Sequence, residues 1–180
     1  LNTNTLAGNY SIETRFGRLT VTAANISNED EFTVSQPADT MYNGEEQAQA
    51  VTVTRGETEL VEGIDYTVAY SDDVKNVGEV TVTVTGIGNY TGTVEKTYNI
   101  TARSVILTSA TDGKVYDGTP LTRNAQTDVT VTGNGFAAGE GAVYSITGTQ
   151  TEVGGSDNEF TYELNTNTLA GNYSIETRFG

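Results

Sequence analysis

An identical internal repeat constrains this chain more than any other feature of its sequence. The stretch LNTNTLAGNYSIETRFG occupies residues 1–17 and again residues 164–180, so the second copy starts 163 positions (164 minus 1) after the first. Exposed Thr, Asn and Glu positions tolerate exchange at little cost in stability, so folding alone does not keep two copies identical. The identity indicates a recent duplication, and we expect the chain to be a segment of a longer tandem array.

A second, diverged repeat lies inside this period and divides it into two related units, A and B. The corresponding motifs are MYNG at 41–44 with VYDG at 115–118, NVG at 76–78 with EVG at 152–154, GNY at 88–90 with GNY at 171–173, and TYNIT at 97–101 with RLTVT at 18–22. Each unit holds roughly 80 residues, which is enough for a modest core but too few for a deep cleft between lobes.

These repeats predict three parts of the chain. Residues 1–23 are expected to be the C-terminal strands of a preceding B-type module, residues 24–102 an A-type module, and residues 103–180 a B-type module lacking its last strand. The missing strand would correspond to residues 18–22. An open sheet edge leaves backbone groups unpaired. We therefore expect residues 1–22 to pair with residues 103–180 of a neighbouring chain, or to stand where the preceding covalent copy would be. Residues 18–22 are not expected to pair with residues 103–180 of their own chain.

Alternation of apolar and polar residues predicts short, half-buried strands. The runs are LTVT at 19–22, VTVT at 51–54, YTVAY at 66–70, VTVTVT at 80–85 and VTVT at 129–132. Their β-branched residues favour the extended form, and Gly and Asn between them favour tight turns. The pattern predicts an all-β chain of tandem small antiparallel β-sandwich (immunoglobulin-like) domains. We expect the Val residues of 80–84 and 129–131 to point into two separate cores.

One stretch leaves an alternative open. Residues 43–50 contain Glu, Gln and Ala in a row, and a short helix there would favour a β-grasp-like module with one helix across a sheet.

The turn motifs have a more local interpretation. Asp117 is expected to cap the turn that follows it, with Gly118 at positive φ, while Asn172 is interpreted as a turn residue and Tyr173 as an aromatic residue at the edge of the core.

Composition excludes several functions. The chain has 9 basic and 24 acidic residues, a net charge of −15, and neither nucleic acid nor anionic membrane binds such a surface without clustered Lys and Arg. It contains no His and no Cys, so the usual triads, His zinc sites and thiol chemistry have no residues to use. No apolar run approaches the ~18 residues of a membrane span. We expect no enzyme, no cofactor and no membrane insertion within this stretch.

Two weaker hypotheses concern particular side chains. Asp72, Asp73 and Asn76 are the calcium candidates, with residues 29–31 (EDE) as a second acidic cluster, because Ca²⁺ takes six to eight hard oxygen ligands. Neither group matches a spaced calcium loop. Lys114 is the better candidate donor for an intramolecular Lys–Asn cross-link, which requires burial and a neighbouring acid to lower its pKa.

The chain resembles the tandem immunoglobulin-like repeats, of the MBG or YDG type, found in Firmicute cell-surface and adhesin proteins. The resemblance covers essentially the whole chain. It rests on KVYDGTPL at 114–121, GNGF at 133–136, GEG at 139–141, GNY at 171–173, GIDYTV at 63–68, NVG at 76–78 and GIGNYTGT at 86–93. It implies a secreted, wall-proximal or adhesive stalk on a bacterial cell and transfers no catalytic residue.

Two functions follow as hypotheses. The first is a non-catalytic repeat of an extracellular stalk, spacer or filament that presents a distal binding domain, with neighbouring copies as head-to-tail partners. The second is an adhesin module that itself binds a host glycan or protein. An exposed aromatic patch on module B would favour the second hypothesis, and polar faces all round would favour the first.

Overall fold

The computed structural model describes residues 3–4, 7–11, 13–71 and 73–180, and within them the chain is all-β. Fourteen strands form five small sheets, and three single-turn 3₁₀ helices are the only helices in these ranges. The prediction of an all-β chain is confirmed. None of the helices in the described ranges has the length and apolar character needed to cross a bilayer.

Module A, residues 24–102, is built around a four-stranded sheet with the order β3-β9-β7-β6. Its strands are β1 (Ala24–Asn25), β2 (Phe32–Val34), β3 (Thr40–Met41), β4 (Val53–Arg55), β5 (Thr58–Glu59), β6 (Tyr66–Tyr70), β7 (Gly78–Gly86), β8 (Tyr90–Thr91) and β9 (Thr93–Thr101). Successive side chains of a strand face opposite sides, and Val80, Val82 and Val84 of β7 are accordingly buried. The predicted Val face of this strand is confirmed.

Module B, residues 103–180, contains the sheets β11-β10-β14 and β12-β13. Its elements are β10 (Arg103–Ser109), η2 (Gln126–Asp128), β11 (Val129–Gly133), β12 (Ala142–Ile146), β13 (Phe160–Leu164), η3 (Ala170–Asn172) and β14 (Tyr173–Arg178). Val105 and Leu107 of the central strand are fully buried. In β11 only Val129 is buried and Val131 is exposed, so the predicted apolar face of that strand is buried at one end only.

The diverged repeat of the sequence is visible in the pairing of the strands. In module A, β1 runs parallel to β8 with Ala24 opposite Tyr90. In module B, β10 runs parallel to β14 with Arg103 opposite Tyr173. The antiparallel pair β6–β7 likewise corresponds to β12–β13. Two strand pairings therefore recur in both modules, although their sheets differ in strand number and order.

The turn after the Tyr of each repeat motif has the same construction in both modules. Asn43 Oδ1 accepts a hydrogen bond from the Glu45 N–H (2.8 Å), and Asp117 Oδ1 accepts one from the Thr119 N–H (2.9 Å). The glycines that follow have φ of 89° and 77°, values that favour Gly. The predicted capping role is confirmed. Residues 43–50 form this turn and irregular backbone with no helix, so the helix required by the β-grasp alternative is absent from that stretch.

The buried apolar residues form one cluster that extends through both modules. The rings of Tyr42 in module A and Tyr173 in module B meet edge to face, with centroids 5.6 Å apart. The expectation of two separate cores is therefore wrong at the joint, where aromatic packing connects them. The backbone passes from β9 to β10 through Ala102, and no strand of one module pairs with a strand of the other in the part of the chain described.

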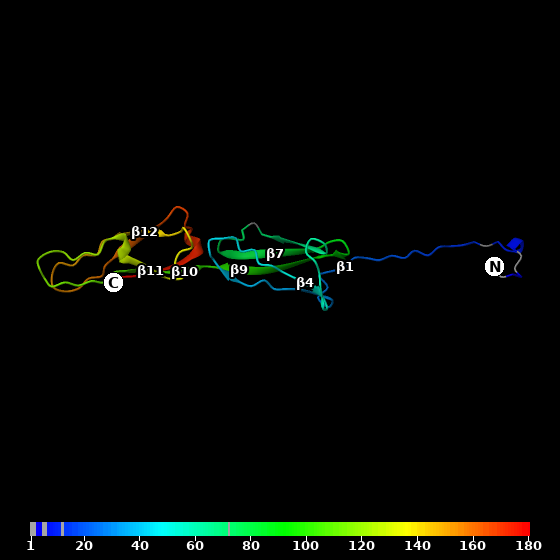
Figure 1. The fold of residues 1–180 in the computed structure, drawn as a ribbon, viewed down its shortest axis with the longest axis horizontal. Helices are drawn as coiled ribbons and strands as arrows, with labels where there is room; N and C mark the ends of the chain where they lie inside the picture. The colour runs from blue at the N-terminus through cyan, green and yellow to red at the C-terminus, as the bar shows by residue number, and fades with distance from the viewer. Residues whose placement is uncertain (1–2, 5–6, 12, 72) are drawn as a thin grey trace.

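Residues 13–23 form an exposed tail that leads into β1 and pairs with no other strand of the described chain (Figure 1). Residues 18–22 were predicted to be a half-buried strand, but they form no strand and are exposed, because nothing in the described chain packs against them. As expected, they do not pair with residues 103–180 of their own chain. The helix η1 (Ala7–Asn9) lies further along this tail. Figure 1 shows the tail at one end of the molecule and the long loops of module B at the opposite end.

Candidate functional site

Two features of the described chain combine unusual geometry with side chains of defined chemistry, and the first is the joint between the modules. It is centred on Glu140 of module B. The Tyr42 hydroxyl of module A donates a hydrogen bond to Glu140 Oε1 (2.5 Å), and the Tyr173 hydroxyl donates to Oε2 (2.7 Å). The Ala137 N–H donates to the Tyr173 hydroxyl (3.0 Å). One carboxylate therefore binds a phenol from each module.

Asn172 makes the second polar link of the joint. Its side-chain oxygen accepts a hydrogen bond from the Val77 N–H (3.0 Å), and its Nδ2 donates to Asn76 Oδ1 (2.8 Å). Because Asn172 is buried, both ends of its amide require partners, and module A supplies them. The interpretation of Asn172 as a turn residue therefore misses its main contacts.

Arg103 fixes the backbone where the chain passes between the modules. Its Nε donates to the Gly135 carbonyl (2.7 Å) and its Nη2 to the Asn134 carbonyl (2.6 Å), both in module B. Its Nη1 donates to the carbonyl of Tyr42 in module A (3.4 Å). The backbones also approach closely, since a Cβ at Gly44 would lie 3.1 Å from the Cβ of Ala137. Hydrogen bonds of Glu140, Asn172 and Arg103 thus link the two modules at the joint.

The electrostatics of the joint keep both phenols neutral. Burial and the Glu140 carboxylate raise the pKa of Tyr173 to about 12. The same two causes raise the pKa of Tyr42. Removal of either proton would place a phenolate beside a carboxylate. Both hydroxyls are therefore hydrogen-bond donors across the physiological range.

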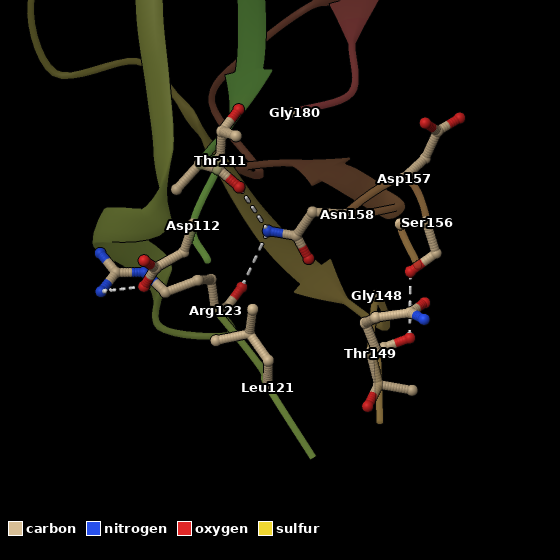
Figure 2. Close-up of a pocket in the computed structure, with 13 residues that line it drawn as sticks. Thr111, Asp112, Leu121, Arg123, Gly148, Thr149, Ser156, Asp157, Asn158 and Gly180 are labelled. Carbon is tan, nitrogen blue, oxygen red and sulfur yellow. Dashed lines mark hydrogen bonds and ion pairs between the residues drawn. The ribbon is translucent and has the colours of Figure 1, made fainter. Parts of the chain in front are cut away.

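The second feature is a groove at the end of module B furthest from module A. It consists of two adjoining hollows between residues 110–116 and 148–158. Figure 2 shows the hollow that includes Gly180. Backbone hydrogen bonds join Leu121 and Gln150 in both directions (2.8 and 3.1 Å), and these two residues line both hollows. We call this feature the distal groove.

Gly180 lies at one end of the distal groove, in the view of Figure 2 next to Thr111. Its N–H donates to Ser109 Oγ (3.1 Å), and its carbonyl accepts from the Asn158 N–H (2.9 Å). A Cβ at this position would lie 2.4 Å from the Ser109 carbonyl oxygen and 2.7 Å from Thr111 Oγ1. Only Gly allows so close an approach, so the backbone at Gly180 is fixed at this end of the groove.

Apolar side chains beside the distal groove are left in solvent. Val115 and Val153 are 89% and 88% exposed, and Tyr116 is 57% exposed. Tyr116 and Val153 line the hollow that does not include Gly180, and Val115 directly precedes Tyr116 in the sequence. The acidic residues Glu152 and Asp157 also line the groove and have no ion-pair partner among the residues described. The groove thus combines unpacked apolar surface with negative charge.

The calcium candidates form a self-contained turn. Asp73 accepts hydrogen bonds at Oδ1 from the N–H groups of Lys75 and Asn76 and at Oδ2 from Asn76 Nδ2, all at 2.9 Å. These bonds lower the pKa of Asp73. Asn76 in turn binds Asn172, so these side chains serve the joint. Asp72 lies outside the described residues. No cluster of three or more potential ligands occurs among the described residues.

The other charged candidates are likewise paired. Glu31, in the second acidic cluster, binds Arg55 (2.6 Å). Lys114, the candidate cross-link donor, binds Asp117 (2.8 Å) and Thr119 Oγ1 (2.6 Å). The contact with Lys114 is the largest cause of the lowered pKa of Asp117. Lys114 therefore braces the turn at 117–119.

Comparison with protein-family models, with curated proteins and with solved structures finds no match for this chain. The joint and the distal groove are therefore interpreted from their own geometry. Sequence reasoning did not find the joint, because the residues that bind across it are 61 to 98 residues apart along the chain. The sequence held one indication of these contacts, the Asn–Tyr pair at 172–173, which recurs at 89–90 in the other unit.

Proposed function

We propose that this chain is a non-catalytic structural repeat of a bacterial extracellular stalk, spacer or filament. Each module would be a small immunoglobulin-like β-sandwich, as in the MBG- and YDG-type repeats that the sequence resembles. In this proposal the chain lies at the cell surface or cell wall and holds a distal binding domain away from it. Neighbouring copies of the repeat are its partners.

The joint is the observation that carries this proposal. A spacer keeps its two ends at a fixed distance only if its modules keep their relative orientation. Relative motion is the usual expectation for two domains joined by a small interface. Here Glu140, Asn172 and Arg103 each bind across the joint, and the modules lie end to end along the long axis (Figure 1). A rigid, end-to-end pair is the geometry that a stalk requires.

The surface supports the same role. A net charge of −15 makes parallel rods repel one another and keeps them soluble. The exposed apolar side chains of module B are mostly aliphatic, among them Val115, Val143 and Val153. Sugars stack on aromatic rings, so these residues give the host-glycan alternative less support than the spacer.

Solution scattering together with ¹⁵N relaxation tests the proposal. Strand β7 of module A has nine residues and strand β10 of module B has seven. At about 3.3 Å per residue they span about 30 and 23 Å, so two aligned modules extend over at least about 50 Å. We expect both modules to share one anisotropic rotational correlation time. Combining Tyr42→Ala with Asn172→Ala should release them and shorten the mean particle length.

The matched control combines Tyr10→Ala with Asn124→Ala, both at exposed positions away from the joint. It should leave the scattering and the relaxation unchanged. Independent tumbling of the modules in the unmodified chain would contradict the proposal, because flexibly linked modules cannot set a distance.

A further inference from the structure

We infer that module A bears tension along the axis of the chain through one short contact, the parallel pair β1–β8, and that the module unfolds and lengthens the chain when this contact breaks. The inference rests on the proposed function, because a stalk held at both ends is put under tension. It adds a mechanical activity to that function, since the module keeps its length below a threshold force and extends above it. All the contacts involved lie within residues 24–102.

Tension enters and leaves module A at opposite ends. The chain enters at Ala24, the first residue of β1, and passes into module B through Thr101, the last residue of β9, and Ala102. Figure 1 shows β1 where the tail joins module A, and β9 leading towards β10 at the other end of the module. A pull along the axis therefore draws β1 towards the tail and β9 towards module B.

The path between these two points is short. Strand β1 pairs with β8, with Ala24 opposite Tyr90 and Asn25 opposite Thr91. Only Gly92 separates β8 from β9, so the load that reaches β8 then follows the backbone to Ala102. The pair β1–β8 is thus the one non-covalent step on this path, and the strands β2 to β7 lie outside it.

The parallel direction of this pair decides how it resists a pull. Strands β1 and β8 both run from the tail towards module B, so opposite pulls at Ala24 and Ala102 slide one strand along the other and do not peel it away. Hydrogen bonds between strands lie across them, so sliding loads these bonds together. The Ala24 N–H donates to the Asn89 carbonyl (3.0 Å). The Ile26 N–H donates to the Thr91 carbonyl (2.8 Å).

Side chains strengthen this contact. Ile26, which directly follows β1, is fully buried, so sliding of β1 moves an apolar side chain out of the core and into water. Asn25 lies against Gly92 between β8 and β9, where a Cβ would be 1.9 Å from Asn25 Oδ1. On β8, Tyr90 packs edge to face on Phe32, with ring centroids 5.9 Å apart. The contact is short but closely packed.

The other end of the path is held by more bonds. Strand β9 pairs with β7 from Thr93 to Ile100, and its last two residues also pair with β3. Strand β1 pairs with β8 over two residues. Under a rising pull the pair β1–β8 should therefore break first, while the ladder between β7 and β9 is still intact.

Breaking β1–β8 exposes the rest of the module to the load. Until then the load crosses directly from β1 to β8, and residues 27–89 carry little of it. Afterwards residues 24–102 unravel, and these 79 residues at about 3.6 Å each extend to about 280 Å. The folded module spans about 30 Å along β7. The chain should therefore lengthen by about 250 Å.

Single-molecule pulling at constant force tests this path. The chain has no native Cys, so two engineered thiols define where it is held. Ala23→Cys and Ala102→Cys, both at exposed positions, load module A between its entry and its exit. We expect one extension of about 250 Å. Release in several smaller steps would show that other strands yield before β1–β8, and would overturn the inference.

Ala24→Pro removes one of the two loaded bonds, because Pro has no N–H and is tolerated at the first residue of a strand. It should raise the rate of this extension at a given force roughly two- to tenfold, the factor that one hydrogen bond contributes to an equilibrium. Asn25→Ala, at an exposed position, is a second variant. It removes the acceptor of two hydrogen bonds from Ser27 and should raise the rate in the same direction.

Val80→Ala is the matched control. Val80 is fully buried in β7, opposite Tyr98 and outside the load path. Its contacts are still formed when β1 separates, so this substitution should lower the urea midpoint and change the extension rate under force by less than about twofold. Equal acceleration by Val80→Ala and by the two β1 variants would show that the whole core resists the pull, and the inference would be wrong.

Moving one attachment point separates the load path from general destabilisation. Glu57 is exposed in the turn between β4 and β5, so a chain held at Glu57→Cys and Ala102→Cys is not loaded through β1. Ala24→Pro and Asn25→Ala should then leave the extension rate unchanged. The same acceleration in both geometries would contradict the inference. None of these results alters the scattering or relaxation of the chain at rest, so the proposed function is tested separately.

Discussion

The hydrogen bond between Tyr42 and Glu140 should couple the stabilities of the two modules. We consider Tyr42→Phe, which removes the hydroxyl and keeps the ring packed against Tyr173, and Glu140→Gln, which removes the charge and keeps the shape. Each variant alone weakens the bond across the joint. The double variant loses this bond only once, so its loss in free energy of unfolding should be smaller than the sum of the losses of the two single variants.

The expected magnitude follows from the contacts. A hydrogen bond to a charged acceptor contributes about 1.5–3 kcal/mol. Glu140 is partly exposed, so hydrogen bonds to water replace part of the lost interaction with Tyr42. We expect each single substitution to reduce the free energy of unfolding by about 1–2 kcal/mol, and the coupling energy of the pair to be about 1–2 kcal/mol.

Urea unfolding of the full chain measures this cycle. Far-UV circular dichroism and tyrosine fluorescence serve as probes, since the chain has no Trp. Tyr98→Phe is the matched control, because its hydroxyl bonds to the Gln47 carbonyl (2.7 Å) within module A. Its effect should add to that of Glu140→Gln. Additivity of Tyr42→Phe and Glu140→Gln within about 0.3 kcal/mol would refute a joint held by this bond.

Three further predictions concern pH, backbone and metal. Folding raises the pKa of Tyr173 to about 12 from about 10. The neutral phenol therefore contributes roughly 3 kcal/mol to the free energy of unfolding below pH 10, and this contribution is lost as the pH rises towards 12. Urea midpoints should fall between pH 10 and 12, and less steeply in Tyr173→Phe. Both Gly92 and Gly56 have positive φ, but only a Cβ at Gly92 would lie 1.9 Å from Asn25 Oδ1, which must then move and give up the hydrogen bonds it accepts from Ser27. Gly92→Ala should therefore cost about 1–3 kcal/mol more than Gly56→Ala; equal melting temperatures would contradict this. Calcium and chelator should leave the melting temperature unchanged, since Asp73 is already hydrogen-bonded; a calcium-dependent rise of several degrees would point to a metal site.

The fold class and the turns could be predicted because they depend on local chemistry. Strand β7 follows from alternating Val and Thr, and the turns at Asn43 and Asp117 follow from a capping side chain beside a Gly at positive φ. These signals lie within a few residues of one another. The diverged repeat extended the prediction further, because one module then serves as a template for the other.

The joint could not be predicted from the same signals. Glu140 and Tyr42 have no local pattern that distinguishes them from any exposed acid or strand-end Tyr, and their contact depends on how two whole modules meet. The separate-core expectation failed for the same reason. The distal groove could not be predicted either, because the exposure of Val115 and Val153 beside it became visible only in the structure.

The two identical copies of the repeat show how far context decides structure. Residues 164–180 include η3 and β14, which pairs with β10 over six residues, whereas residues 13–17 of the first copy are exposed and unpaired with other strands of the described chain. Tyr173 is 7% exposed and its counterpart Tyr10 is 62% exposed. Local propensity is the same in both copies, so the packing against β10 accounts for the difference.

Hydrogen exchange followed by mass spectrometry tests this directly. A peptic fragment shared by the two copies has one mass before labelling. Its isotope envelope should split into two of equal area, one rapidly labelled from the tail and one protected from residues 173–180. The protection arises from the ladder between β14 and β10 and from the bond of the Gly180 N–H to Ser109 Oγ. A chain starting at Arg18 should give the protected envelope alone. A single envelope from the full chain at every labelling time would show that the two copies share one environment, and the contrast between a packed strand and a free tail would then be wrong.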